Sequence, residues 1–477
     1  MTKSFPLALT YDDVLLVPQR SKVEHRSDTD TSSYLTAKIK LNIPLLSANM
    51  DTVTEAPMAI AMAKTGGLGI IHRFMSIDNQ IKQVDKVKRH QSFLLKKPYT
   101  VSPNKPIRHL IDKINIHSVS SYLVINQKNQ LQGLVTKRDI IFQSNLSQPV
   151  SKIMTPLNKL ITVKPGITQN KARKLFKKHK IEKLPVIDKN NIVKSLITAK
   201  SVYNNEQNTL ASKDKKGRLL CGGAVGVVGD YLERAQELIK ANVDVIVVDV
   251  AHGQNQVSLK AIKALRKKFP KVQIIGGNVA TASGAKDLIR AGVNTIKVGI
   301  GPGGICSTRI VTGVGIPQLS AIIDCVQAVK NTNIKIIADG GTNFPGDITK
   351  ALAAGASTIM LAGWFAGTNE SPGEIIIRNN KRYKIHRGSA SFMSQADANI
   401  KLNNKKQLNT IIPEGVESLI EYKGHVAEII YQLLGGLRSG MSYCNAFTIK
   451  QLQKNAKFIR MTSAGFRESK THNIIEI

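Results

Sequence analysis

Short apolar runs recur along the chain, and each ends in glycine or a polar residue. Within a run the residues are continuously apolar rather than alternating, which is typical of parallel strands buried on both faces. Most runs are too short and too rich in β-branched residues to form helices. Between the later runs the chain is amphipathic with a helical period, as at residues 231–241 and 282–291. The eight runs are residues 43–51, 67–72, 223–228, 243–249, 272–278, 295–301, 334–341 and 358–364.

Eight strand–helix units predict an α/β fold, the (β/α)8 or TIM barrel. In such a barrel functional residues collect at the carboxyl ends of the strands, and phosphate often binds after the seventh and eighth strands. The seventh and eighth runs end in Asp339-Gly340-Gly341 and Ala362-Gly363-Trp364, and Cys306 follows the sixth. We therefore expect a nucleophile, an acid and two glycine-containing turns on one face of the barrel.

A duplicated segment interrupts the regular spacing, because about 150 residues separate the second and third runs. Residues 100–125 align without gaps to 162–187, and residues 133–140 align to 195–202 at the same offset of 62 residues. Each half reads as strand, helix, strand, strand, helix. The predicted domains are the barrel at 1–92 and 206–477, and the insert at 93–205 with halves of about 97–148 and 150–205.

The composition excludes several classes of protein. With 477 residues, 42% of them hydrophobic and 21% charged, the chain is globular and long enough for two or three domains. No apolar run approaches the ~18 residues that cross a bilayer, and the first residues have no apolar segment followed by a cleavage site. Four scattered cysteines without a CxxC pair argue against a zinc site or disulfides. We expect a cytoplasmic protein that does not contact membranes.

The net charge of +35 raises the question of nucleic acid binding. Residues 91–210 alone hold 21 Lys and Arg against 5 Asp and Glu. Much of the excess consists of isolated lysines on predicted exposed helix faces, as in residues 171–180, and no aromatic platform accompanies them. A lysine-rich composition explains most of the charge, with binding of polyanionic nucleotides explaining some of the rest. Nucleic acid is not the expected partner.

The loop after the sixth run, KVGIGPGGICSTR (297–309), presents Cys306 among four glycines and a proline. Glycines allow a tight turn and close approach of the backbone to a ligand or ion. A thiolate at such a tip is a nucleophile when its pKa is lowered. Thr308, two residues further on, could donate or accept a proton beside it. A structural cysteine in a buried turn is the alternative, although such a turn does not need this composition.

Several motifs together resemble the IMP dehydrogenase/GMP reductase superfamily. The resemblance covers nearly all of residues 8–92 and 215–470, and implies a barrel whose thiolate attacks C2 of a purine nucleotide. Besides the Cys306 loop, the motifs are LTYDDVLLVP (9–18), NMDTVTE (49–55), GGNVAT (276–281), IVTGVGIPQ (310–318), IADGG (337–341), ESPGE (370–374) and GGLRSGMSY (435–443).

The resemblance leaves two reactions open, and the flap at about 386–415 separates them. A dehydrogenase transfers hydride from IMP to NAD⁺ and then hydrolyses the thioimidate with water activated by an Arg–Tyr pair on the flap. A reductase releases ammonia from GMP and reduces C2 with NADPH, and therefore needs no activated water. Residues 388–413 contain neither Arg nor Tyr. This favours GMP reductase, with IMP dehydrogenase as the alternative and a non-catalytic nucleotide sensor as a less favoured third.

Two further motifs favour the reductase. DVAHGQ (249–254) resembles the reductase pattern after the fourth strand, and RGSAS (387–391) stands where dehydrogenases usually have Arg-Gly-Met-Gly-Ser. Many reductases lack an insert, but a branch of dehydrogenase-like GMP reductases keeps it. The chain resembles that branch.

The resemblance also implies site residues. Cys306 is the nucleophile, and Thr308 and Glu414 protonate departing ammonia, as general acid catalysis requires. Glu414 could instead be an exposed loop residue, and Asp339 a helix N-cap. The implied nucleotide ligands are Asn278, Gly303, Gly304, Asp339, Gly341, Gly363, Gly388 and Ser389. The implied cofactor ligands are Asp249, Ala251 and His252. The backbone carbonyls of Gly301, Gly303 and Cys306 resemble a site for a monovalent cation such as K⁺.

Three positions depart from the family pattern. Gly304 and Trp364 replace serines that usually touch phosphate, a loss that backbone donors or a cation such as Arg387 could offset. Trp364 could cover the cofactor or base, or simply pack. His386, where tyrosine is common, could be a ligand contact or a surface residue.

The duplicated insert resembles paired CBS modules (a Bateman domain), which bind adenine or guanine nucleotides. In that family Thr and Asp of a T-x-x-D motif hold the ribose, and Thr136 and Asp139 match it. In the second half Thr198 matches, but Ser201 replaces the acid. A regulatory ATP or GTP is expected, the alternative being a degenerate module kept only for assembly. Family resemblance implies a homotetramer or octamer.

Overall fold

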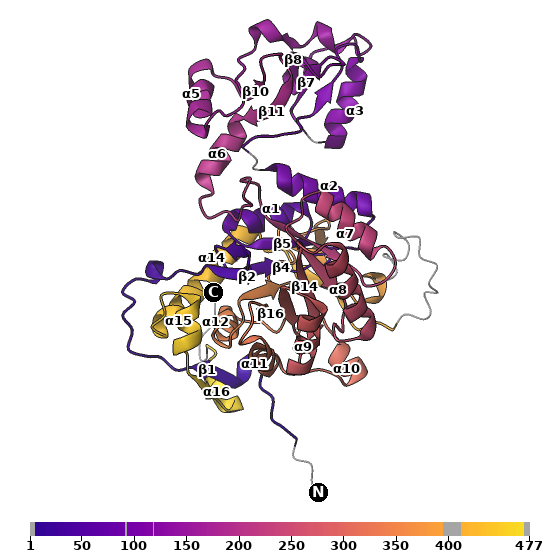
Figure 1. Ribbon diagram of the computed structural model, residues 1–477. Coiled ribbons are helices and arrows are strands. Elements are labelled where there is room, and N and C mark those ends of the chain that lie inside the picture. Colours follow the sequence, from indigo (N-terminus) through magenta and orange to yellow (C-terminus); the bar gives the residue numbers. More distant parts are fainter. Residues whose placement is uncertain (1–4, 91–92, 118, 395–411, 472–477) are drawn as a thin grey trace. The chain divides into compact units, whose positions relative to one another are not determined.

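The chain divides into two compact units. A computed structural model describes residues 5–90, 93–117, 119–394 and 412–471 (Figure 1). The first unit comprises Met1–Lys88, Leu210–Asp214 and Leu219–Ile477, and the second comprises Arg89–Thr209 and Lys215–Arg218. The second unit contains the sequence repeat.

The first unit is built on a closed barrel of eight parallel strands, which confirms the predicted (β/α)8 fold. Every predicted apolar run overlaps one of these strands. Six of the eight strands end before their runs do, because the last residues of those runs leave the sheet and form the loops above it; the exceptions are Val245–Asp249 and Gln273–Val279. In hydrogen-bonded order the strands are β12 (Cys221–Val225), β13 (Val245–Asp249), β14 (Gln273–Val279), β15 (Thr295–Val298), β16 (Lys335–Asp339), β17 (Thr358–Leu361), β4 (Leu45–Ser47) and β5 (Leu68–Ile71).

Helices surround the barrel (Figure 1). The predicted helix at 282–291 shows how their ends are set: Thr281 Oγ1 accepts a hydrogen bond from Gly284 N at 3.0 Å, and Gly292 ends the helix with φ +100°. Their apolar faces pack on the outside of the strands. The helices are α1 (Ala56–Thr65), α2 (Ile77–His90), α7 (Tyr231–Lys240), α8 (Gln256–Lys268), α9 (Ala282–Ala291), α11 (Gln318–Val329), α12 (Pro345–Ala353) and α14 (Val426–Tyr443).

The amino-terminal end of the barrel is closed by the hairpin of β2 (Ser33–Thr36) and β3 (Ile39–Leu41). Its side chains Leu35, Ile39 and Leu41 join the apolar cluster formed by the inward-facing residues of the barrel. Thr295, the first residue of β15, donates its hydroxyl hydrogen to Leu35 O. Because this hairpin seals one end, the carboxyl ends of the strands remain for a site.

A small antiparallel sheet lies between β17 and α14 in the sequence. It consists of β18 (Ile376–Arg378), β19 (Lys381–Arg387) and β20 (Glu417–Glu421). Arg387 pairs with Glu417, so the predicted flap is the connection between β19 and β20. Peripheral elements are β1 (Val14–Leu16), which pairs with β21 (Phe458–Arg460), and α10 (Thr308–Thr312), α15 (Ile449–Asn455) and α16 (Ser463–Glu468).

The second unit repeats one arrangement of elements. The first half contains β6 (Thr100–Val101), α3 (Ile107–His117), β7 (Ser121–Ile125), β8 (Leu131–Thr136) and α4 (Lys137–Ile141). The second half contains α5 (Gln169–His179), β10 (Lys183–Ile187), β11 (Val193–Thr198) and α6 (Ala199–Gln207). The expected first strand of the second half is reduced to a single bridge between Val163 and Val186.

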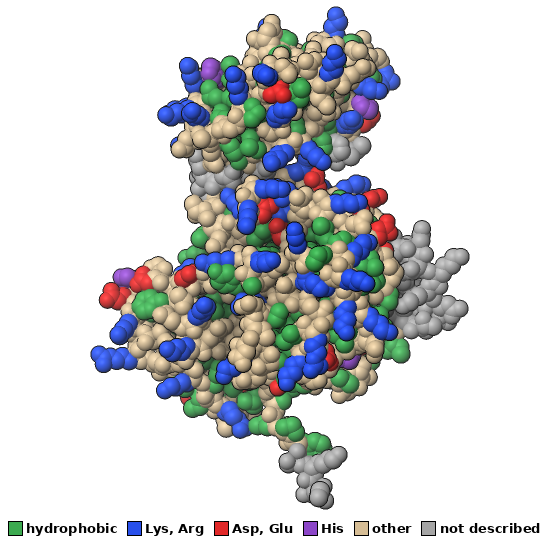
Figure 2. Space-filling view, in the orientation of Figure 1, with side chains coloured by type: hydrophobic (Ala, Val, Ile, Leu, Met, Phe, Trp, Pro, Cys, Tyr) green, Lys and Arg blue, Asp and Glu red, His purple; other side chains and the backbone are tan. Residues whose placement is uncertain are grey.

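Lys and Arg side chains are scattered over the face shown in Figure 2 rather than gathered at one place. Among the described residues, no helix is long and apolar enough to cross a membrane.

A buried lysine joins three segments at the base of the barrel. Lys88, at the end of α2 and 3% exposed, donates to Asp244 Oδ2 at 2.5 Å and to Leu219 O at 2.9 Å. It also lies 3.5 Å from Asp214 Oδ2. Asp244 in turn accepts the backbone N–H of Cys221, the first residue of β12. These contacts hold together the points at which the chain leaves the first unit, at Lys88, and returns to it, at Asp214 and Leu219. Most of the second unit lies between these points in the sequence.

Replacing Lys88 with methionine should lower the free energy of unfolding of the barrel by about 3–5 kcal/mol, because it leaves two largely buried carboxylates, Asp214 and Asp244, without their cation. Urea denaturation followed by the fluorescence of Trp364, the single tryptophan, reports on the barrel. Lys86→Met, at an exposed position of the same helix, is the matched control, with an expected change of at most about 0.5 kcal/mol. Equal effects of the two substitutions would contradict a structural role for the Lys88 contacts.

Candidate active site

A cavity of 1440 Å³ opens at the carboxyl ends of the barrel strands. Its wall is formed by residues at or after the ends of all eight barrel strands, among them the loop that carries Cys306, and by the two stems of the flap, which we define as residues 388–390 and 412–417. Most of the predicted site residues line it: Asp249, Ala251, Asn278, Gly301, Gly303, Gly304, Cys306, Thr308, Asp339, Gly341, Gly363, Gly388, Ser389 and Glu414.

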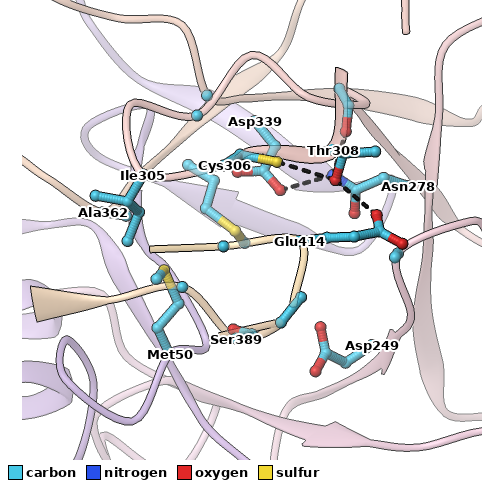
Figure 3. A pocket seen from close by; sticks show the side chains of 18 of the residues that line it. Met50, Asp249, Asn278, Ile305, Cys306, Thr308, Asp339, Ala362, Ser389 and Glu414 are labelled. Carbon is cyan, nitrogen blue, oxygen red and sulfur yellow. Dashed lines mark hydrogen bonds between the residues drawn. The ribbon is translucent and has the colours of Figure 1, made fainter. Parts of the chain in front are cut away.

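Cys306 is the exposed one of the four cysteines and therefore the candidate nucleophile. The other three cysteines are buried, and burial raises the pKa of the Cys325 thiol to about 12 and also raises that of Cys444. The sulfur of Cys306 lies 3.2 Å from Thr308 Oγ1, and the Thr308 hydroxyl donates to Glu414 Oε2 at 2.8 Å (Figure 3). We call these three residues the relay. Glu414 is half-buried and bonded to Thr308, so the alternative that it is an exposed loop residue is wrong.

Backbone hydrogen bonds between two distant segments hold the relay together. Ser307 N donates to Glu414 O at 3.0 Å, and Val416 N donates to Ile305 O at 3.0 Å. Cys306 and Gly415 form a bridge between these bonds. A Cβ on Gly415 would lie 3.3 Å from Gly388 Cα, so the two flap stems approach too closely for side chains there.

The relay can move a proton between the thiol and the carboxylate. The Thr308 hydroxyl carries one proton and two lone pairs, so it can accept from the sulfur while donating to Glu414. Such a chain lets Glu414 receive a proton from the nucleophile or return one to a leaving group near the sulfur. Nucleophile and acid are thus present in one cavity.

A second polar cluster lies at the ends of β14 to β16. Asp339 Oδ2 accepts from Asn278 Nδ2 at 2.9 Å and from Lys297 Nζ at 2.6 Å. Lys297, 5% exposed, also donates to Asn278 Oδ1. No residue in the described part of the chain donates to Asp339 Oδ1, so this oxygen can accept from a ligand. Asp339 does not cap a helix, because α12 begins at Pro345 after Phe344.

The two glycine turns lie side by side above β16 and β17. Gly341 has φ +82°, and a Cβ on Gly304 or Gly363 would meet nothing within 4 Å, so their backbones face open space. The indole N–H of Trp364 donates to Thr342 O at 3.1 Å. Trp364 therefore ties one turn to the other and packs against the core.

Of the three residues expected to bind the cofactor, Asp249 and Ala251 line the cavity and His252 does not. Asp249 lines the cavity, where Arg73 Nε lies 3.1 Å from its Oδ2. His252 does not line the cavity; instead its carbonyl accepts from Asn255 at the start of α8. Sequence reasoning missed Arg73 and the loop at 226–230, which also line the cavity. Arg73 directly follows the run at 67–72, and the loop lies at the end of the run at 223–228, so their sequence positions could have indicated both as site residues.

The expected cation ligands come from a tight turn. Gly301 has φ +79°, and the carbonyl of Gly303 accepts from Cys306 N at 3.0 Å within the loop. That carbonyl keeps a second lone pair for a cation. Among the described residues, no group of three or more His, Cys, Asp or Glu could hold a metal ion. Flap residues 395–411 lie outside the described residues, so the absence of Arg and Tyr from the flap is known from the sequence and not from the structure.

His386 lines the cavity and is 3% exposed, so the alternative that it is a surface residue is wrong. Its Nδ1 lies 3.3 Å from Thr52 Oγ1. Burial, together with the nearby charge of Lys423, lowers the pKa of His386 to about 4. The imidazole is therefore neutral at physiological pH and can offer one N–H.

The T-x-x-D residues of the insert bind one another. Asp139 Oδ2 accepts from Thr136 Oγ1 at 2.7 Å and from Thr136 N at 2.6 Å, at the start of α4. In the second half, Ser201 N donates to Thr198 Oγ1 at 3.0 Å, and Ser201 Oγ donates to Thr198 O at 2.7 Å. Both motifs thus have a local role at the start of a helix.

Comparison with known proteins identifies the family. The family described as "IMP dehydrogenase / GMP reductase domain" matches residues 8–472. Inosine-5'-monophosphate dehydrogenase of Nitrosopumilus maritimus is 47% identical over 475 residues, covering 99% of both chains. The chain belongs to the IMP dehydrogenase/GMP reductase family, and is thus an oxidoreductase of purine nucleotide metabolism that uses a nicotinamide cofactor.

Two solved structures of GMP reductase from Trypanosoma brucei are also similar. A cysteine-to-alanine variant in complex with guanosine 5'-monophosphate is 40% identical, with a TM-score of 0.93 and 99% of both chains covered. The complex with guanosine 5'-triphosphate is 38% identical, with a TM-score of 0.81 and coverage of 96% of this chain and 99% of that one. The family predicted from the motifs is confirmed.

The buried His386 should make stability depend on pH. Its pKa of about 4 in the folded protein lies below the value of about 6.5 expected after unfolding, so the unfolded chain binds more protons between these values. Stability should therefore fall as the pH drops from 7 towards 4, by roughly 3 kcal/mol from this residue. In His386→Phe this part of the loss should vanish, as measured by thermal unfolding at several pH values. Parallel curves for both proteins would contradict it.

Proposed function

We propose that the protein is an NADPH-dependent GMP reductase, which converts GMP to IMP and ammonia in purine interconversion and salvage. The observation that carries this proposal is the flap sequence, which contains neither Arg nor Tyr over residues 388–413. Without that pair a dehydrogenase would form its thioimidate and hydrolyse it poorly. The DVAHGQ motif and the likeness to a GMP reductase described with GMP support the same reaction.

The relay supplies the protons that deamination needs. Cys306 Sγ adds to C2 of GMP, and the thiol proton passes through Thr308 towards Glu414. The relay then returns a proton to the exocyclic amine, which leaves as ammonia, and a thioimidate remains on the sulfur. Hydride addition to C2 breaks the C–S bond, so the products are IMP and the free thiolate.

The nucleotide is proposed to lie with its ribose at Asp339 and its phosphate at the two glycine turns. Asp339 Oδ1 can accept from ribose hydroxyls, while Lys297 and Asn278 hold Oδ2. Backbone N–H groups near Gly304, Gly341 and Gly363 can donate to phosphate oxygens. Gly388 and Ser389, from the flap stem, complete the wall around the base.

The cavity has room for a dinucleotide beside GMP, with Asp249 and Ala251 on its wall. When bound, NADPH supplies the hydride. Asp249, already held by Arg73, can orient the carboxamide side of that cofactor through its remaining acceptor positions. NAD(H) is the alternative. A K⁺ ion at the carbonyls of Gly301, Gly303 and Cys306 would fix the turn that presents the sulfur.

The insert is proposed to be a CBS pair that binds a regulatory purine nucleotide, ATP or GTP. Thr136 and Asp139 are the first candidates to hold its ribose, since their mutual hydrogen bonds place both side chains at one helix start. Thr198 with Ser201 offers a weaker second site without a carboxylate. A homotetramer or octamer in the cytoplasm is the expected state.

IMP dehydrogenase is the second candidate. The N. maritimus relative carries that name at 47% identity, and Glu414 at the end of the relay could take a proton from water as readily as give one to ammonia. This enzyme would convert IMP, NAD⁺ and water to XMP and NADH.

Two assays separate the candidates. With GMP and NADPH, the protein should consume NADPH and release one ammonia per NADPH; with IMP and NAD⁺, it should form no NADH. Cys306→Ala is the control, because it removes the nucleophile and should bind nucleotide without turnover. NADH and XMP formation in the second assay would overturn the proposal.

Breaking the relay should slow catalysis without unfolding the site. Glu414→Gln keeps a side chain that can accept from Thr308 but cannot move a proton, so turnover should fall about 10²- to 10⁴-fold. The measurement is steady-state turnover with GMP and NADPH, beside the dissociation constant for GMP. Glu417→Gln, at an exposed position on the same flap stem, is the control and should stay close to wild type. A Glu414→Gln enzyme of normal turnover would refute the acid role.

A further inference from the structure

We infer that Lys423 supplies the positive charge that receives the 5′-phosphate of the nucleotide, a role that rests on the proposed binding of a purine mononucleotide. The sequence suggested Arg387 as the cation that offsets the serines replaced by Gly304 and Trp364, but the Arg387 guanidinium donates to Asp51 Oδ2 instead. Lys423 lies two residues beyond β20, far along the chain from both glycine turns.

Backbone hydrogen bonds fix Lys423 beside the turn that follows β17. Lys423 N donates to Gly367 O at 3.0 Å, and Asn369 N donates to Gly424 O at 2.8 Å. From this position the Lys423 ammonium donates to Gly363 O at 2.5 Å. Its side chain is half-buried and lines the cavity, so the ammonium lies at the wall next to the glycine turn.

Lys423 is the one charged cation of the described cavity wall that has no carboxylate partner. Arg73 is 3.1 Å from Asp249, and Arg234 is 2.6 Å from Asp230. His386 is neutral near pH 7, since its pKa is about 4. The Lys423 ammonium makes one hydrogen bond to a carbonyl, and burial lowers its pKa. A half-buried ammonium with donors to spare is stabilised when an anion enters.

The anion that fits this corner is a phosphate monoester. The open backbones of Gly304 and Gly363 and the turn at Gly341 offer N–H donors, and the Trp364–Thr342 hydrogen bond holds the last two turns together. Backbone donors orient the oxygens, whereas a dianion also needs a countercharge when it leaves water. Lys423 provides that countercharge, and its contact with Gly363 puts it at the same turn.

The test compares a nucleotide with its nucleoside in equilibrium binding to the full chain. Lys423→Gln is preferred to methionine, because its amide removes the charge while keeping a hydrogen-bond donor on the side chain. Loss of a charged hydrogen bond should raise the dissociation constant for IMP about 10- to 100-fold and leave that for inosine unchanged. Trp364 fluorescence shows that the variant is folded.

Lys384→Gln is the matched control. Lys384, 4% exposed, also donates to a backbone carbonyl, Ser371 O at 2.7 Å, but does not line the cavity. Its substitution should leave the ratio of the two dissociation constants as in the wild type. Equal weakening of IMP and inosine by Lys423→Gln, or no weakening of IMP, would overturn the inference. IMP is the product of one candidate reaction and the substrate of the other, so this outcome is independent of which reaction is catalysed.

Discussion

The active site depends on the hydrogen bonds that join the Cys306 loop to the flap stem at 414–416. Cys306 and Glu414 are far apart in sequence, and the bonds from Ser307 to Glu414 and from Val416 to Ile305 bring the carboxylate to Thr308. A thiol without that carboxylate would be an exposed cysteine with no proton acceptor. The close approach of Gly388 and Gly415 is part of the same constraint, since side chains there would push the stems apart.

The barrel supports this contact by supplying groups from separate strands at one end. The β2–β3 hairpin seals the opposite end, and the inward-facing apolar residues fill the space between, so the strand ends are held rigidly. Charges at these ends are then paired locally, as in Lys297 with Asp339 and Arg73 with Asp249. Because a buried unpaired charge is costly, the remaining uncompensated ammonium of Lys423 is informative about the ligand.

In the insert, the motif proposed to bind a nucleotide also stabilises the local structure. Thr136 and Asp139 form a capping arrangement that stabilises the start of α4 whether or not a nucleotide is present. In the second half Ser201 takes over part of that capping without a charge. These contacts of Ser201 explain how α6 begins without a carboxylate at the position that corresponds to Asp139. The first half, which has the carboxylate, is the better candidate for nucleotide binding.

The sequence by itself determined the barrel, the duplicated insert and the family, since continuous apolar runs, an internal repeat and the Cys306 loop are all local patterns. It also indicated Cys306 and Thr308, which belong to the glycine-rich loop after β15, and Asp339, which ends β16. The family resemblance had paired Glu414 with Thr308, and the structure supplies the contact between them. Tertiary structure alone decided that Lys297 meets Asp339, that Lys423 lies at Gly363, and that His252 lies away from the cavity. The physical reason is that strands and helices form according to their neighbours in the sequence. Contacts between loops depend instead on how the closed barrel and the flap stems bring remote residues together.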